Sequence, residues 1–349
     1  VSLYRRLSTL LVKSNNMLSG NTFTGEPDKI FTDVANYTKV TAEDIMRVYE
    51  KYIKGKNHVV VSTIPEGKLE LAIEGSIPAD MQFESIAQQK TMSKAGEIID
   101  DPYEHTPSKI DRSIEPALLS NTPEINIPDI WEMTLSNGIE IKGIQHKEIP
   151  LVYFCFTLNR GASHDTADKA GVACLTANML KEGGTSTMSP EDLEEAFAEY
   201  GANVNCYGSV ECTYLSGQCL NKDFAKVMQL VSDMILNPGW DEEAFNIAKE
   251  NTLDELKRSK TTQKSIASYA FKTLLWGKDH TFTNGSRGTE ETVKSLTLDD
   301  LKEFHAKYYS PSITKMAIVG DLTSKEVKKA MQPLVKGWEP MDVDLTGME

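Results

Sequence analysis

The sequence predicts an α+β fold with a mixed, largely antiparallel sheet packed by helices. Strand-like segments come both before and between the helical ones, unlike the regular strand–helix alternation of a parallel sheet. Residues 131–142 form two short strand patterns around Asn137-Gly138, which is a strong hairpin signal. A helix–strand unit also occurs twice along the chain, and such a repeat indicates duplicated α/β modules.

The two copies of this unit are residues 40–53 and residues 296–309. Each copy begins with a threonine that can cap a helix and an aspartate three residues later. Apolar side chains then recur at helical spacing, and β-rich runs follow at residues 58–64 and 315–320. We therefore expect residues 1–64 to be the C-terminal, helix–strand piece of a preceding domain that is similar to the main one.

The other elements of the main domain follow from apolar periodicity and from start and stop signals. The pair Ser189-Pro190 is typical of an N-cap and first helical residue, and Gly183-Gly184 of a helix end. Strands are expected at residues 151–158, 203–208 and 211–220, and helices at residues 170–181, 190–200, 223–237, 241–258, 262–276 and 324–331.

Composition divides the chain into four parts. Half of its 14 prolines lie between residues 65 and 128, where periodicity is weak, so we interpret residues 65–128 as a Pro-rich linker. The main domain is residues 129–335, and residues 336–349 start a connection to a further domain. Within residues 1–64 we expect helix, loop, helix and strand, with the loop at residues 21–27. Because the first residues already resemble a helix interior, we interpret the chain as a piece of a longer polypeptide.

The charge and cysteine content narrow the possible partners. A formal net charge of −14 argues against nucleic acid and anionic membrane surfaces, and no apolar run is long enough for a membrane span. The charge is compatible with basic peptides, although solubility alone also explains it. The five cysteines are odd in number and contain no C-x-x-C, so we expect free core thiols. Bacterial periplasm and cytoplasm both remain open as locations.

Short motifs along residues 130–321 carry a resemblance to a known family. They are TLSNGIEI (134–141), RGASHD (160–165), GVACLTANMLKEGGT (171–185), YGANV (200–204), GTEETV (288–293), and FHAKYYSP followed by VGD (304–321). In this order they resemble the pitrilysin/insulinase zinc peptidases, which include the mitochondrial processing peptidase and core subunits of a respiratory complex. The resemblance implies a processing-peptidase-like α/β domain.

In the catalytic members of that family, an H-x-x-E-H helix carries two zinc ligands and a general base, and a later carboxylate completes the ligand set. In this chain Cys174 and Asn178 stand at the two histidine positions, and Ala177 stands at the position of the base. Glu255 lies close to where the third ligand is expected, although an exposed helix carboxylate is the simpler interpretation. The resemblance therefore implies a degenerate site without metal or catalytic residues.

The histidines do not replace the missing ligands. The chain has six, and none are at the spacing of an H-x-x-H or H-E-x-x-H motif. His305 lies at helical spacing from Leu301 and Tyr308, so we expect it to be packed against the fold or half-exposed.

The resemblance also implies a function. Family members build two similar halves around a chamber, and one half carries the zinc. This chain would contain the catalytically silent half that completes the substrate chamber of a zinc-dependent metallopeptidase, inactive by itself. Zinc is expected in the upstream half, and the partners are peptide substrates with the catalytic half of the same chain or a partner subunit. A zinc-free structural or assembly subunit and the partner chain of a two-chain protease remain alternatives.

One strand is a candidate for substrate binding. Residues Asn203, Val204, Asn205, Cys206 and Tyr207 match a strand that forms an edge of the sheet in catalytic halves of the family, where extended peptides join it by β-augmentation. The main chain would make these contacts, so the changes at residues 174–178 do not exclude them. A protected edge without a ligand is the alternative.

Overall fold

The computed structural model describes residues 4, 5, 7, 9–65, 67–77, 111, 128–278 and 280–345. The chain divides into two compact units, Val1–Lys29 with Asn126–Glu349, and Ile30–Ile125. Most of the expected linker at residues 65–128 lies outside the described residues, and so do the last four residues of the expected connection at residues 336–349.

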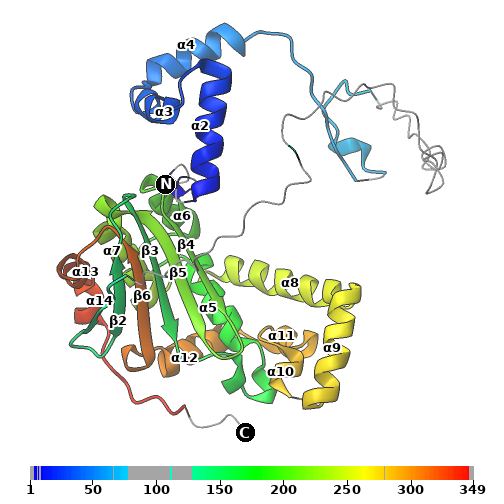
Figure 1. Ribbon diagram of the computed structural model, residues 1–349. Helices are drawn as coiled ribbons and strands as arrows, with labels where there is room; N and C mark the ends of the chain where they lie inside the picture. The colour runs from blue at the N-terminus through cyan, green and yellow to red at the C-terminus, as the bar shows by residue number, and fades with distance from the viewer. Residues whose placement is uncertain are drawn as a thin grey trace. The chain divides into compact units, whose positions relative to one another are not determined.

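The larger unit contains one six-stranded sheet with the order β1-β2-β6-β3-β5-β4. Strands β2 and β6 are parallel, and every other neighbouring pair is antiparallel. The expected α+β fold with a mixed, largely antiparallel sheet is thereby confirmed (Figure 1). The strands are β1 (Trp131–Thr134), β2 (Glu140–Gln145), β3 (Leu151–Leu158), β4 (Asn203–Gly208), β5 (Thr213–Leu220) and β6 (Thr314–Gly320).

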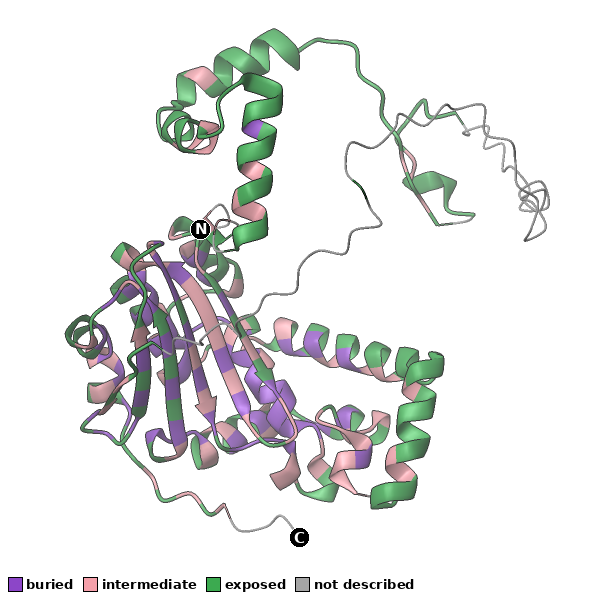
Figure 2. Ribbon diagram, viewed as in Figure 1, coloured by how far each residue is buried: buried purple, intermediate pink, exposed green. Residues whose placement is uncertain are grey.

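One face of this sheet packs against helices. Along β3, Val152, Phe154 and Phe156 are buried and belong to the hydrophobic core, whereas Tyr153 on the other face is 39% exposed. This alternation is typical of an antiparallel sheet that has a single apolar face. Figure 2 shows the same alternation of buried and exposed residues along the strands.

Helices of the larger unit begin and end at recognisable signals. Ser189 accepts a hydrogen bond from the backbone N–H of Asp192 and caps the helix that starts at Pro190, as expected. The helices are α2 (Leu10–Thr24), α5 (Val172–Glu182), α6 (Pro190–Glu199), α7 (Phe224–Leu236), α8 (Glu242–Ser259), α9 (Gln263–Trp276), α10 (Thr281–Asn284), α11 (Glu290–Ser295), α12 (Leu298–Tyr308), α13 (Ser324–Ala330) and α14 (Gln332–Gly337).

Helix α5 is the central helix of this layer. Most of its side chains are buried, and it contacts β4, α8 and α12. A helix that is apolar on nearly all sides is expected at such a buried position. The backbone of α5 is therefore held by the sheet and by two other helices, which gives the residues along it a well-defined place.

The second copy of the repeat forms α12 and β6. Thr297 and Asp300 make a complete capping box at the start of α12. Leu301 is fully buried and Phe304 is 5% exposed, so the helix packs on the core, and β6 lies between β2 and β3. Burial of each of these side chains contributes about 2 kcal/mol to the stability of the fold.

The first copy of the repeat lies in the smaller unit. Helices α3 (Lys29–Tyr37) and α4 (Ala42–Tyr52) are formed, and Thr41 and Asp44 make the capping box of α4. The apolar side chains of α4 remain exposed, with Ile45 at 61% and Val48 at 43%.

Two expectations for the first 64 residues are wrong. Residues 58–64 form no strand, because the described part of this unit offers no second strand to pair with them. The expected loop at residues 21–27 begins later, since α2 continues to Thr24 and ends where Gly25 adopts a left-handed conformation with φ of 75°.

Candidate functional site

Helix α5 carries three of the four residues at the degenerate zinc-motif positions. It starts at Gly171, whose φ of 101° lets the chain turn sharply into the helix. The backbone N–H of Gly171 donates a hydrogen bond of 2.9 Å to Oδ2 of Asp165, which holds this start in place. Burial raises the pKa of Asp165 to about 7, although N–H groups at the helix start and the charge of Arg160 favour the ionised form.

The structure brings Cys174, Asn178 and Glu255 together. They line a cavity of about 570 Å³ between α5, α8 and the end of β4. Ala177 does not line this cavity, because it is fully buried in the core. The degenerate positions therefore form a real recess, with a thiol and an amide on one wall and a carboxylate on another.

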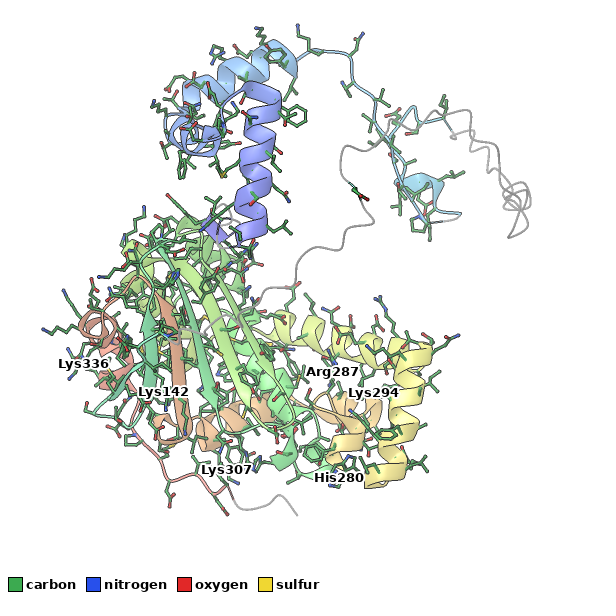
Figure 3. All side chains as sticks on the ribbon, viewed as in Figure 1. Lys142, His280, Arg287, Lys294, Lys307 and Lys336 are labelled. Atoms are coloured by element: carbon green, nitrogen blue, oxygen red, sulfur yellow. The ribbon has the colours of Figure 1, made fainter. Side chains whose placement is uncertain are left out.

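Arg287 occupies this recess as well, and sequence analysis did not predict its role. Its Nε lies 2.7 Å from Oε2 of Glu255, and both side chains are somewhat more than half exposed. An ion pair this exposed contributes only about 0–1 kcal/mol to stability. Its importance is chemical, because the carboxylate at the third ligand position already has a cationic partner. Arg287 is labelled in Figure 3.

Cys174 is a neutral thiol in this environment. Its side chain is buried, and burial raises the pKa of the thiol. The charge of Arg287 and hydrogen bonds with Gly208 and Ser286 favour the thiolate without overcoming that effect. A neutral, buried thiol is a poor nucleophile.

This donor set does not fit the zinc ion that the resemblance implies for a catalytic half. A zinc site needs at least three protein ligands, and Asn178 and Ala177 supply none of the usual kind. Glu255 is paired with a guanidinium. In the part of the chain that the structure describes, no group of three or more His, Cys, Asp or Glu side chains could hold a metal ion.

The candidate peptide-binding strand lies beside this cavity. β4 is the last strand of the sheet and pairs only with β5 among the described strands. Asn203, Asn205 and Tyr207 are exposed along it, whereas Val204 is buried and Cys206 half-buried. Tyr207 lines the cavity and stacks on Tyr214 at a centroid distance of 5.1 Å. The structure thus places residues 203–207 at a sheet edge, as expected.

His305 has a structural role. Its Nε2 lies 2.9 Å from the carbonyl oxygen of Ile235, so this nitrogen carries the proton. The ring also contacts Trp240 edge to face. Burial lowers the pKa of His305 to about 4, which keeps the ring neutral. The structure agrees with the expectation of a packed histidine.

Two family models match this chain. The model of the insulinase family (peptidase family M16) matches residues 145–280, and the model of the peptidase M16 inactive domain matches residues 295–346. Together they cover most of the sheet domain from the last residue of β2 onward, apart from residues 281–294. In the described residues, no helix is long and apolar enough to cross a membrane.

Curated relatives include a bacterial protease and a mitochondrial subunit. The uncharacterized zinc protease YmxG of Bacillus subtilis is 24% identical, over 57% of this chain and 48% of its own length. Subunit 1 of the mitochondrial cytochrome b-c1 complex of Bos taurus is 21% identical, over 61% of this chain and 44% of its own length. The chain spans about half the length of these relatives.

Solved structures share the fold. The peptidase M16 inactive domain from Pseudomonas fluorescens superposes with a TM-score of 0.57 and 21% identity, over 62% of this chain and 52% of that chain. The periplasmic protease PqqL from Escherichia coli superposes with a TM-score of 0.55 and 20% identity, over 61% of this chain and 24% of that one. With its sheet domain matched by both family models, the chain belongs to the insulinase family of peptidases, family M16.

Proposed function

We propose that this chain supplies the catalytically silent half of a zinc-dependent metallopeptidase that cleaves peptides. One observation carries the proposal. The helix at the zinc-motif position is folded and largely buried, but it offers Cys174, Ala177 and Asn178, and Arg287 is paired with the remaining carboxylate of Glu255. The family fold is present without the donors that zinc and water activation require.

In this proposal the zinc belongs to another half, either in the same polypeptide or in a partner subunit. The sheet domain, residues 129–335, completes the substrate chamber. Residues 1–64 are the end of a similar preceding domain, residues 65–128 link the two, and residues 336–349 lead to a further domain. The exposed apolar face of α4 supports this arrangement, because the equivalent face of α12 is buried in its own domain.

Peptide binding at the β4 edge is the activity that this half retains. An extended peptide adds to an edge strand through main-chain hydrogen bonds, which do not depend on the altered side chains. The neighbouring cavity, lined partly by Tyr207 and Gly208 at the end of β4, supplies room for a side chain of the peptide.

The test uses the complete 349-residue chain. Metal analysis by mass spectrometry after purification in zinc-containing buffer is expected to find well below one zinc per chain. Incubation with fluorogenic peptides is expected to give no chelator-sensitive cleavage. One tightly bound zinc per chain, or cleavage abolished by a chelator, would contradict the proposal.

A structural subunit is the second candidate, and the similarity to subunit 1 of the cytochrome b-c1 complex favours it. The two candidates differ in peptide binding. A peptidase half binds extended peptides at β4, whereas a purely structural subunit does not need to do so. Fluorescence anisotropy with labelled unstructured peptides therefore separates them.

A further inference from the structure

We propose that Arg287 has taken the place of a metal cation in the cavity at Cys174, Asn178 and Glu255. Its guanidinium then holds a backbone carbonyl oxygen of an extended peptide bound along β4. The cavity would be a peptide-holding site that lacks the means to cut. This inference rests on the peptide binding proposed above and adds the residue and the ligand atom that define the contact.

The first argument is the position of Arg287. Its Nε is 2.7 Å from Oε2 of Glu255, and Arg287 lines the same cavity as Cys174. The guanidinium is therefore close to two of the positions that correspond to metal ligands in the catalytic members. It neutralises the carboxylate there, as a bound cation would.

The second argument is that Arg287 has N–H donors that its ion pair with Glu255 does not use. An arginine side chain carries five N–H donors in a planar fork. Glu255 is its one ion-pair partner among the described residues, and that contact uses Nε. The side chain of Arg287 is 55% exposed, so its terminal N–H groups are open to a ligand.

The third argument is the closeness of β4 to this cation. A Cβ atom added to Gly208 would lie 2.7 Å from Cα of Cys174, so the end of the strand touches the backbone of α5. Tyr207, Gly208 and Arg287 line the same cavity. A peptide that follows the outer edge of β4 to its end therefore reaches the cavity that Arg287 lines.

The charges around the cavity select a neutral acceptor. Its lining contains three carboxylates, Glu182, Asp254 and Glu255, and two guanidinium groups, Arg258 and Arg287. The lining therefore carries no excess of positive charge that would attract a ligand carboxylate. A peptide carbonyl oxygen carries only a partial charge and accepts a hydrogen bond from a cation well. Ala177 supplies no carboxylate to activate water, so the held peptide bond stays intact.

The experiment tests which carbonyl oxygen of a bound peptide contacts Arg287. A library of fluorescein-labelled, uncharged, twelve-residue synthetic peptides is screened by anisotropy against the whole chain, and the tightest binder is used. Each of its amides is then replaced singly by an ester, which removes the N–H donor and weakens the carbonyl as an acceptor. Esters that remove an N–H bonded to β4 should weaken binding whether or not Arg287 is present. We expect the ester at the carbonyl that Arg287 holds to reduce affinity about 5- to 10-fold, as for loss of a hydrogen bond to a charged group.

The same scan is repeated in Arg287→Met and in a control, Lys257→Met. Lys257 is an exposed cation on α8 that pairs with Asp254, so the control removes the same charge near the cavity. In Arg287→Met the sensitive ester should have no further effect, whereas in Lys257→Met its effect should persist. Arg287→Lys, which keeps the charge, serves as a second variant with intermediate affinity expected.

The possible failures differ. If no peptide in the library binds the unaltered chain, the proposed peptide-binding function is contradicted. If peptides bind but Arg287→Met and Lys257→Met behave alike, peptide binding stands and the role assigned to Arg287 is refuted. If circular dichroism shows that Arg287→Met is misfolded, Arg287→Lys decides, because unchanged ester sensitivity and affinity there would contradict a contact through the planar fork.

Discussion

The guanidinium of Arg160 lies 3.7 Å from the ring centroid of Tyr308, and this contact joins the end of β3 to the end of α12. Arg160 is 5% exposed. Its Nη2 donates a hydrogen bond to the carbonyl oxygen of His164, and its Nη1 donates to that of Asp344. The buried side chain of Arg160 thus connects the loop before α5, helix α12 of the second repeat copy and the C-terminal segment.

We expect Arg160→Ala to lower the free energy of unfolding by about 2–3 kcal/mol, since it removes a desolvated cation–π contact and two charge-assisted hydrogen bonds. Urea denaturation followed by circular dichroism measures this change. Lys307→Ala is the control, because that exposed cation also lies over the Tyr308 ring, at 5.0 Å, and should change stability by less than about 0.5 kcal/mol. A loss in Arg160→Ala below about 0.5 kcal/mol, as expected for Lys307→Ala, would mean that the contacts of Arg160 add little stability.

Asp165 should make stability depend on pH. Its pKa is raised to about 7 in the folded chain, whereas an unfolded aspartate titrates near 3.9. Between these values the folded state binds more protons than the unfolded state, so stability falls as pH rises from about 4 to about 7 and then levels off. We expect the free energy of unfolding to depend less on pH in Asp165→Asn, because asparagine does not titrate. Urea midpoints measured at pH 4.5, 6 and 7.5 show the difference between the two proteins.

A wild-type stability that rises over this interval relative to Asp165→Asn would mean that the helix N–H groups and Arg160 outweigh burial. The carboxylate would then be ionised in the folded state.

Gly208 sets the contact between β4 and α5. In Gly208→Ala the new Cβ would meet three backbone atoms, including Cα of Cys174 at 2.7 Å and the carbonyl oxygen of Ala173 at 3.2 Å. Backbone atoms cannot rotate away, so the strand must move, and we expect a loss of about 1–3 kcal/mol. Thermal unfolding of this variant and of Asn205→Ala, an exposed position in the same strand, measures the effect. Unchanged stability in Gly208→Ala would mean that the strand end is not fixed on α5.

Local signals predicted much of the fold. Residues 151–158 form a strand at the expected bounds, because their apolar and β-branched run needs no distant information. The capping boxes of α4 and α12 are also local, since each is made by side chains three residues apart. The short helices α10 and α11 were not predicted, because so few residues show no periodicity.

The failures came from long-range contacts. Residues 58–64 resemble β6 in sequence, but a strand exists only where a second strand pairs with it. Arg287 lies in a turn between Gly285 and Gly288, both with positive φ. The ion pair between Arg287 and Glu255 could not be predicted from the sequence, because that contact depends on how α8 and this turn pack together.

The last prediction concerns zinc. We expect Cys174→His with Asn178→His to bind zinc weakly, since Glu255, the third ligand, is paired with Arg287 at 2.7 Å. Adding Arg287→Ala frees the carboxylate and removes a positive charge beside the metal. Zinc affinity should then rise at least about 10-fold, because two histidines and a carboxylate are a common catalytic ligand set. Competition with a chromophoric chelator measures both variants, and Lys257→Ala in place of Arg287→Ala is the control. If zinc affinity is the same with and without Arg287, the guanidinium does not occupy the metal position.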